Sequence, residues 1–220
     1  MADIGSSYFM DPDVVVEYAK AYINKHLVPL IIASGERLEG NVFMSEPLVY
    51  NDAFANKTKN LAKVASDYMH ITHAMEIGFN AGFSALLMLI SNPVLRLTCV
   101  DLGNHSYTLP CYTQMKKTFG NRLTLILGDS RDMLPRVHDA YDLIHIDGGH
   151  LSDVVHNDIV QSYRLSRVGT ILIMDDYDFE AIHPLWDAHI QIYGLTPVEC
   201  YECPYHDIRR VPPFPYDSLR

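Results

Sequence analysis

The stretch Glu76-Ile-Gly-Phe-Asn-Ala-Gly-Phe-Ser84 follows an apolar run and carries two glycines near its centre. This pattern is typical of a strand that turns tightly into a helix, because glycine tolerates backbone conformations that other residues avoid. Two later apolar runs also end in acidic residues, at Asp147 and at the pair Asp175 and Asp176. In an open α/β sheet, ligands bind in the crevice outside the carboxyl ends of the strands. These strand ends therefore predict one shared ligand site.

Strands and helices are expected to alternate from residue 72 onward. Short apolar runs predict buried strands at 74–77, 95–101, 123–127, 141–147 and 170–174, with helical segments between them. Such alternation is typical of βαβ units and a parallel sheet. After Gly194 the pattern favours strands again, at 195–201 and 207–211, and predicts an antiparallel hairpin at the sheet edge. The expected fold class is α/β.

The first 70 residues follow a helical pattern. Asp11 can cap a helix whose first residue is Pro12, since proline is tolerated at that position. A loop is expected at 35–46 and a second helix at about 52–68, where the lysines are interpreted as a solvated face without a function: Lys57, Lys59 and Lys63. We therefore divide the chain into an N-terminal helical extension or lid, 1–70, and a ligand-binding domain, 71–220.

The composition restricts the partners. The 220 residues carry a net charge of −10, and no run of Lys or Arg is long enough to follow a phosphate backbone, so nucleic acid is not expected as the main partner. The sequence has no signal-peptide pattern and no apolar run near the roughly 20 residues of a membrane span. We accordingly predict a cytoplasmic protein without a membrane partner.

The glycine turn and the next two strand ends favour a nucleoside ligand. Free backbone N–H groups at the start of the helix after Gly78 can receive an anionic group. Asp101 ends the second predicted strand, where a carboxylate can accept hydrogen bonds from both hydroxyls of a ribose. Asp129 and Ser130 follow the third strand and can either edge an adenine pocket or cap the next helix, and these two interpretations are compatible.

The last two strand ends favour a metal. Carboxylates on neighbouring strands, which lie about 4.8 Å apart, can converge on one cation, and an all-oxygen ligand set favours Mg²⁺, Mn²⁺ or Ca²⁺. Asp147, Asp175 and Asp176 are the predicted ligands. His150, three residues after Asp147, is either a general base or a cap of the following helix. His145 lies inside the strand and is interpreted as a core histidine.

With these residues in view, the chain resembles the class I S-adenosylmethionine-dependent methyltransferases, and among them the metal-dependent O-methyltransferases of the catechol and macrocin types. The resemblance covers about residues 70–195 and rests on the glycine motif, the acid at Asp101 and the three carboxylates. It implies a Rossmann-like, seven-stranded, mostly parallel sheet. It also implies that Asp147 and His150 take part in catalysis and that a divalent metal, with Mg²⁺ favoured, is bound by Asp147, Asp175 and Asp176. The cofactor contacts that it implies are Glu76, Gly78, Phe79, Asn80, Gly82, Ser84, Asp101, Leu102, Asp129, Ser130 and Asp147.

The resemblance implies metal-assisted O-methylation of a small hydroxyl-bearing substrate, with the N-terminal helices over that substrate. The catechol type has Asp-Asn where this chain has Asp175 and Asp176, so a catechol acceptor is not implied. Two other hypotheses are a nicotinamide-dependent oxidoreductase, which the glycine spacing disfavours, and a cofactor-binding protein without turnover. The tyrosines of the N-terminal helices could also serve a homo-oligomer interface.

Overall fold

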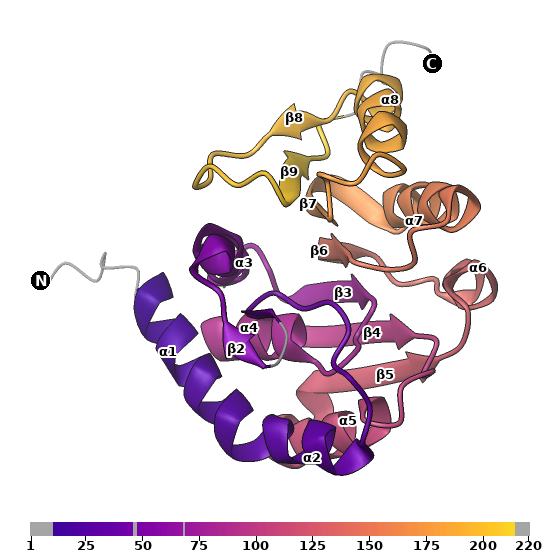
Figure 1. Ribbon diagram of the computed structural model, residues 1–220. Helices are drawn as coiled ribbons and strands as arrows, with labels where there is room; N and C mark the ends of the chain where they lie inside the picture. Colours follow the sequence, from indigo (N-terminus) through magenta and orange to yellow (C-terminus); the bar gives the residue numbers. More distant parts are fainter. Residues whose placement is uncertain (1–10, 46–47, 68, 214–220) are drawn as a thin grey trace, which may run out of the picture.

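A seven-stranded sheet forms the centre of the protein (Figure 1). The computed structural model describes residues 11–45, 48–67 and 69–213. The strands of this sheet are β3 (His73–Ile77), β4 (Arg96–Asp101), β5 (Leu123–Leu127), β6 (Tyr141–Ile146), β7 (Ser166–Asp175), β8 (Thr196–Pro197) and β9 (His206–Arg210). Their order across the sheet is β5-β4-β3-β6-β7-β9-β8.

The strands β3 to β7 run parallel to one another, whereas β9 is antiparallel to both β7 and β8. The predicted α/β class, the mostly parallel seven-stranded sheet and the antiparallel terminal hairpin are confirmed. Strand β8 is much shorter than the predicted segment 195–201, and the backbone after Pro197 leaves the sheet before His206 starts β9.

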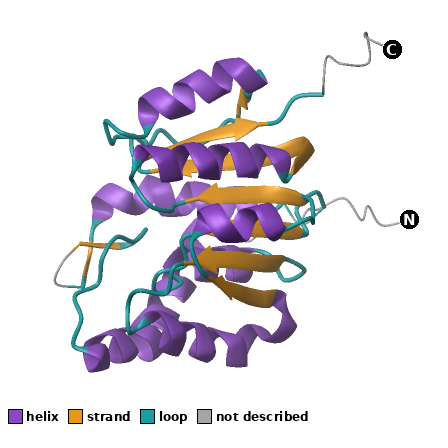
Figure 2. Ribbon diagram, turned by 90° about the vertical axis from the view of Figure 1, so that its right-hand side faces the viewer, coloured by secondary structure: helices purple, strands orange, loops and turns teal. Residues whose placement is uncertain are grey.

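Helices cover both faces of the sheet (Figure 2). They are α1 (Pro12–Tyr22), α2 (Val28–Ser34), α3 (Ala55–Ala65), α4 (Phe83–Ser91), α5 (Thr108–Phe119), α6 (Ser130–Met133), α7 (Ser152–Arg164) and α8 (His183–Tyr193). Val15 of α1, Leu61 of α3 and Leu86 of α4 belong to one buried apolar cluster. Ile159 of α7 and Trp186 of α8 belong to a second cluster on the opposite face.

The N-terminal extension shares the core of the sheet domain. Val15 and Ala19 of α1 are completely buried, and a π-helical turn (Ile23–Leu27) joins α1 to α2. The predicted loop contains β1 (Met44–Ser45), which pairs with β2 (Val49–Tyr50). Asn92 ties the end of α3 to the start of β3, because its side chain donates to the carbonyl oxygens of Ala65 and Ile71. The described part of residues 1–70 is therefore packed against the domain, and its role as a lid remains a prediction.

The chain reverses direction across the sheet between β3 and β6. Strands β3, β4 and β5 follow one another outward, and the chain then returns to place β6 on the other side of β3. Such a topological switch opens a crevice at the carboxyl ends of the two central strands. The glycine turn follows β3 and Asp147 follows β6, so the fold places both at this crevice. Among the described residues, no helix is long and apolar enough to cross a membrane.

Candidate active site at the switch point

Gly78 is required by the close approach of two loops. Its φ angle is +97°, and a Cβ atom at this position would lie 1.8 Å from the carbonyl oxygen of Asp147. The two loops are held together by the backbone, since the N–H of Asp147 donates to the carbonyl of Ile77 at 2.9 Å. A side chain at Gly78 would therefore displace Asp147.

Asp101 shapes the glycine turn from the end of β4. Its Oδ2 accepts the backbone N–H groups of Phe79 and Asn80 at 2.8 and 2.7 Å, and its Oδ1 accepts that of Gly103 at 2.6 Å. These bonds hold Asn80 at a φ of +51°, a left-handed conformation that asparagine tolerates better than most residues. Each carboxylate oxygen has two acceptor sites, so Asp101 retains capacity for a ligand hydroxyl.

A first cavity of about 410 Å³ lies beside this turn. Seven of the residues expected to contact the cofactor line it: Gly78, Asn80, Asp101, Leu102, Asp129, Ser130 and Asp147. Asn80 Oδ1 is buried and accepts no hydrogen bond from any described residue. A buried acceptor without a partner is unfavourable, and a ligand with an N–H or O–H group would satisfy it. We name this space the donor cavity, after the methyl donor that the resemblance to methyltransferases predicts there.

Asp129 caps a helix and also lies in a cavity wall, and its contact with adenine stays a prediction. Its side chain accepts the backbone N–H of Arg131 at 2.9 Å and so caps α6, and it also lines the donor cavity. Arg131 pairs with the Asp129 carboxylate at 2.7 Å. Hydrogen bonds from Arg131 hold the pKa of Asp129 below its ordinary value. The cap therefore remains charged beside the cavity.

Two expected cofactor residues lie outside the cavity walls. Glu76 is completely buried inside β3, and Gly82 lies at the start of α4 with φ +80°. A Cβ atom on Gly82 would come within 2.5 Å of Phe79 and 2.7 Å of Met115. Gly82 is thus required for packing between protein side chains, whereas the sequence suggested close approach of a ligand.

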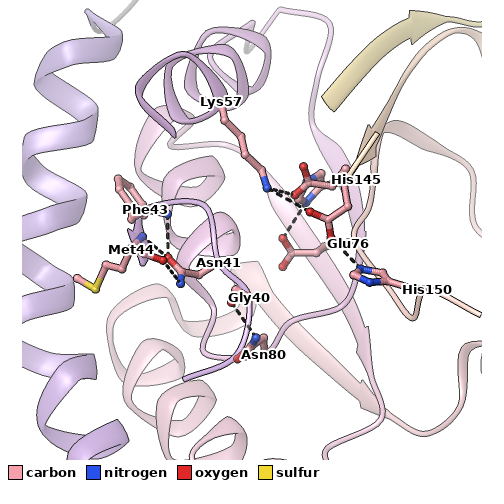
Figure 3. Close-up of polar contacts among 11 residues, drawn as sticks. Gly40, Asn41, Phe43, Met44, Lys57, Glu76, Asn80, His145 and His150 are labelled. Carbon is pink, nitrogen blue, oxygen red and sulfur yellow. Dashed lines mark hydrogen bonds and ion pairs between the residues drawn. The ribbon is translucent and has the colours of Figure 1, made fainter. Parts of the chain in front are cut away.

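A second cavity of about 320 Å³ adjoins the first. We name it the acceptor cavity, after the methyl acceptor that is expected beside the donor. Phe79 and Ser84 line it, as do His150 and Asp176, and Asn80 and Asp147 belong to the walls of both cavities. The N-terminal segment closes one side, because the Asn80 side chain donates to the carbonyl oxygens of Glu39 and Gly40. Figure 3 shows the contact with Gly40.

His150 is paired with Asp176 and does not cap a helix. Its Nε2 lies 2.8 Å from Asp176 Oδ2, and the residue at the N-cap of α7 is Leu151, which has no side-chain capping bond. The hydrogen bond to Asp176 raises the pKa of His150 above its ordinary value. Asp176 adopts a φ of +53°. Such strained conformations concentrate at functional sites.

A buried group of charges lies behind this pair. His145 is a core histidine, as predicted, but both of its ring nitrogens face carboxylates. Nδ1 lies 3.1 Å from Glu76 Oε1, and Nε2 lies 3.5 Å from Asp175 Oδ2. Lys57 Nζ lies 2.8 Å from the same Asp175 oxygen. Figure 3 shows Lys57 reaching from α3 toward His145 and Glu76. We call Lys57, Glu76, His145 and Asp175, together with the partly exposed Asp147 at their edge, the buried charge cluster.

The pKa values in this cluster follow from burial and from opposite charges. Burial alone would lower the pKa of His145, but its contacts with Asp175 and Glu76 outweigh this effect and raise the pKa to about 10. Burial would raise the pKa of Asp175, and the charges of Lys57 and His145 lower it. The pKa of Asp147 is raised well above its ordinary value by burial and by the charge of Asp175.

The prediction that Lys57 lies on a solvated face is wrong. Its side chain is 6% exposed, because Lys57 lies one and two helical turns before Leu61 and Val64 on the buried face of α3. Lys59 is half-buried and pairs with Asp13 at 2.7 Å, and Lys63 is exposed. The helical spacing of Lys57 with Leu61 and Val64 was the signal in the sequence that could have identified it.

The ligand atoms that could hold a metal differ from the predicted set. Atoms of His145, Asp147 and Asp175 lie within 4.8 Å of one another, and Asp176 is not in this group. A histidine that binds a metal must be neutral, whereas His145 faces carboxylates from both nitrogens. Lys57 Nζ already lies against Asp175. In this arrangement the residues do not fit a divalent ion.

Comparisons with known proteins agree with the fold. The O-methyltransferase from Bacillus cereus, solved with S-adenosylhomocysteine, matches with a TM-score of 0.61 and 12% identity over 92% of this chain and 100% of its own. The methyltransferase PaMTH1 of Podospora anserina, also bound to S-adenosylhomocysteine, matches with a TM-score of 0.64 and 15% identity over 97% of this chain and 100% of its own. TomG of Streptomyces achromogenes is an O-methyltransferase of tomaymycin synthesis and was solved with S-adenosylmethionine. It matches with a TM-score of 0.60 and 16% identity over 91% of this chain and 96% of its own. At such identities the likeness establishes the fold.

The sequence itself carries the family signal. Residues 75–177 match the model of a family described as a methyltransferase domain. This range begins within β3 and ends just after Asp176, so it spans the glycine turn and all three predicted carboxylates. No curated protein matches the sequence. Residues 75–177 therefore form a methyltransferase domain, and the fold around it is the one found in the solved methyltransferases.

Proposed function

We propose that the protein transfers the methyl group of S-adenosylmethionine to a hydroxyl oxygen of a small molecule, with His150 as the general base. One observation carries this proposal: the donor cavity and the cavity that contains His150 share Gly78, Asn80 and Asp147 as walls. A methyl donor in one cavity would thus lie beside an acceptor in the other. Holding the two reactants together supplies much of the rate of such a transfer.

The donor cavity suits the cofactor in shape and charge. Asp101 and Asp129 offer carboxylates for ribose and adenine groups, and the unpartnered Asn80 Oδ1 offers an acceptor for an ammonium or amide. The methyl donor is a sulfonium cation, and the carboxylates of Asp101 and Asp129 give the wall of the donor cavity an acidic character that suits it. The solved relatives named above contain S-adenosylmethionine or S-adenosylhomocysteine, which supports the same ligand here.

The pair of His150 and Asp176 supplies the acid–base chemistry. If the Nε2–H group of neutral His150 donates to Asp176, the Nδ1 atom carries the free lone pair and can accept the hydroxyl proton of the acceptor. The alkoxide or phenoxide oxygen then attacks the methyl carbon, and the electron pair of the carbon–sulfur bond goes to sulfur. Asp176 orients the ring and stabilises its cationic form, as the carboxylate does in other His–Asp pairs.

The acceptor is proposed to be a small molecule with a hydroxyl group. The acceptor cavity, at about 320 Å³, is at the lower end of the volumes typical of small-molecule sites. Two of the solved relatives are O-methyltransferases, which supports oxygen as the nucleophile. The divalent metal expected from the sequence has no step in this proposal, because the contacts of Lys57 and His145 occupy its ligands.

The experiment combines cofactor titration with single turnovers on a panel of phenols and sugars. We expect binding of S-adenosylmethionine and none of NAD. His150→Ala should lower the rate of methyl transfer by about 10²–10⁴-fold and leave cofactor affinity unchanged. His70→Ala is the matched control. His70 Nδ1 lies 2.9 Å from Asp67 Oδ1 in a similar pair, and neither residue lines either of the two cavities. Equal rates for His150→Ala and the wild type would refute the assignment of the base.

A further inference from the structure

We propose that Lys57 is a built-in cation that takes the place of a divalent metal at the buried carboxylates, so that methyl transfer by this protein is independent of metal. Lys57 is a positioning residue in this scheme, because it contacts Asp175 and Asp176 and lies in the wall of neither cavity. The inference rests on the proposed function for its consequence on the reaction, and on the contacts of Lys57 alone for its claim about metal binding.

The ammonium group of Lys57 is buried against two acidic residues. Its Nζ lies 2.8 Å from Asp175 Oδ2 and 3.9 Å from Asp176 Oδ1. Burying a charge is costly unless an opposite charge compensates it. Neither oxygen of Asp175 accepts a well-aligned hydrogen bond from a described residue, so ion pairing with Lys57 and His145 is its compensation. The carboxylate therefore already has a cation at the distance of direct contact.

The position of Lys57 is fixed by the helix that carries it. Asn60, three residues further along α3, donates from Nδ2 to the carbonyl of Tyr201 at 2.7 Å and accepts the N–H of Tyr201 at 2.7 Å. The same amide nitrogen lies 2.9 Å from Nε2 of the buried His206. These contacts join α3 to the C-terminal hairpin next to β7. The amine is thus directed to Asp175 by a packed helix.

Four of the five residues of the buried charge cluster pair with one another without a metal. Two buried carboxylates, Glu76 and Asp175, face two nitrogen bases, His145 and Lys57. A divalent ion on Asp147, Asp175 and His145 would lie close to the ammonium group that already pairs with Asp175, and would be repelled by it. Binding of such an ion would require Lys57 to withdraw or to lose its proton.

Lys57 also reaches the base through Asp176. One oxygen of Asp176 lies 3.9 Å from Lys57 Nζ, and the other lies 2.8 Å from His150 Nε2. The lysine from the N-terminal extension therefore helps to set the orientation of the carboxylate that orients His150. This links the extension to the reaction through one side chain.

The test measures Mn²⁺ binding by electron paramagnetic resonance, without substrate, in the wild type and in Lys57→Met, Lys57→Arg and Lys59→Met. The wild type, Lys57→Arg and Lys59→Met should bind no stoichiometric Mn²⁺. Lys57→Met should bind Mn²⁺ with an affinity at least about tenfold higher than the wild type, because the repelling charge of the ammonium group is removed. Lys59→Met is the matched control, since Lys59 lies on the same helix in a surface ion pair.

Methyl transfer by the wild type should be unchanged after chelation, and Lys57→Met should lose activity that Lys57→Arg retains. Stoichiometric Mn²⁺ binding by the wild type would overturn the inference, and this measurement holds even if Lys57→Met does not fold. Loss of wild-type transfer on chelation would also overturn it. Absence of transfer to every acceptor in the panel would instead count against the proposed function, while the Mn²⁺ binding would still decide the role of Lys57.

Discussion

Replacing Gly78 with alanine tests whether the close approach of the two central loops determines the site. The new Cβ atom would lie 1.8 Å from the Asp147 carbonyl oxygen, whereas real Cβ atoms essentially never come within 3.0 Å of a neighbour. The ends of β3 and β6 would have to separate by more than about 1 Å, and such overpacking costs about 1–3 kcal/mol.

Two further effects add to this cost. A left-handed backbone costs alanine about 1–2 kcal/mol. Separation of the loops weakens the hydrogen bond from Asp147 N–H to the Ile77 carbonyl, which is worth about 1 kcal/mol. We expect Gly78→Ala to lower the free energy of unfolding by about 3–6 kcal/mol. Because Asp147 is a wall of both cavities, affinity for S-adenosylmethionine should fall as well.

Gly35→Ala is the matched control. Gly35 has a φ of +73° and no atom within 4 Å of the position of a Cβ, so only the backbone strain of about 1–2 kcal/mol applies. Urea unfolding followed by circular dichroism measures the loss of unfolding free energy in Gly78→Ala and in Gly35→Ala, and calorimetry measures their affinity for the cofactor. Equal losses of unfolding free energy in the two variants would refute the argument from loop contact.

Three other predictions concern individual carboxylates. Asp176→Asn should move the acidic limb of the rate profile to lower pH, because the bond to Asp176 raises the pKa of His150; an unmoved limb would contradict the pairing. Burial raises the pKa of Asp158 to about 6, so folded protein binds the proton more tightly and stability should fall as pH rises from about 4 to 6. Asp158→Asn should abolish this dependence of stability on pH and raise the free energy of unfolding at pH 7 by up to about 3 kcal/mol. If urea unfolding of the variant showed the same pH dependence as the wild type, Asp158 would not be its cause. Glu76→Gln should cost about 3–5 kcal/mol, because it removes the charge of one of the two buried carboxylates that face His145; a loss below about 1 kcal/mol would show that the pair is not stabilising.

The sequence predicted the elements because their signals are local. Apolar runs and glycine turns recur at the spacing of strands and helices, and the strand order then brings Gly78 and Asp147 to one crevice. The methyltransferase class followed from the same stretch and is confirmed by the domain match over residues 75–177. Seven of the residues expected to contact the cofactor line the donor cavity for this reason.

The roles of some residues were assigned less accurately because they depend on neighbours distant in sequence. Gly82 faces Phe79 and Met115, so the glycine serves packing, and no pattern in the motif distinguishes the two uses. Glu76 was expected at the cofactor and instead lies against His145. Side chains inside a parallel strand alternate between the two faces of the sheet, and only the strand neighbours determine what each one meets.

By itself, the sequence determined the α/β sheet, the turn at Gly78 and the acidic strand ends, since each depends on a few consecutive residues. Only the tertiary structure decided which charges meet. Asp175 and Asp176 are adjacent in sequence, yet one faces the buried Lys57 and the other faces His150. Lys57 comes from a helix more than 100 residues earlier in the chain. Its partner is set by how α3 packs on the sheet, because ion pairing in a protein interior depends on distance in space and on exclusion of water.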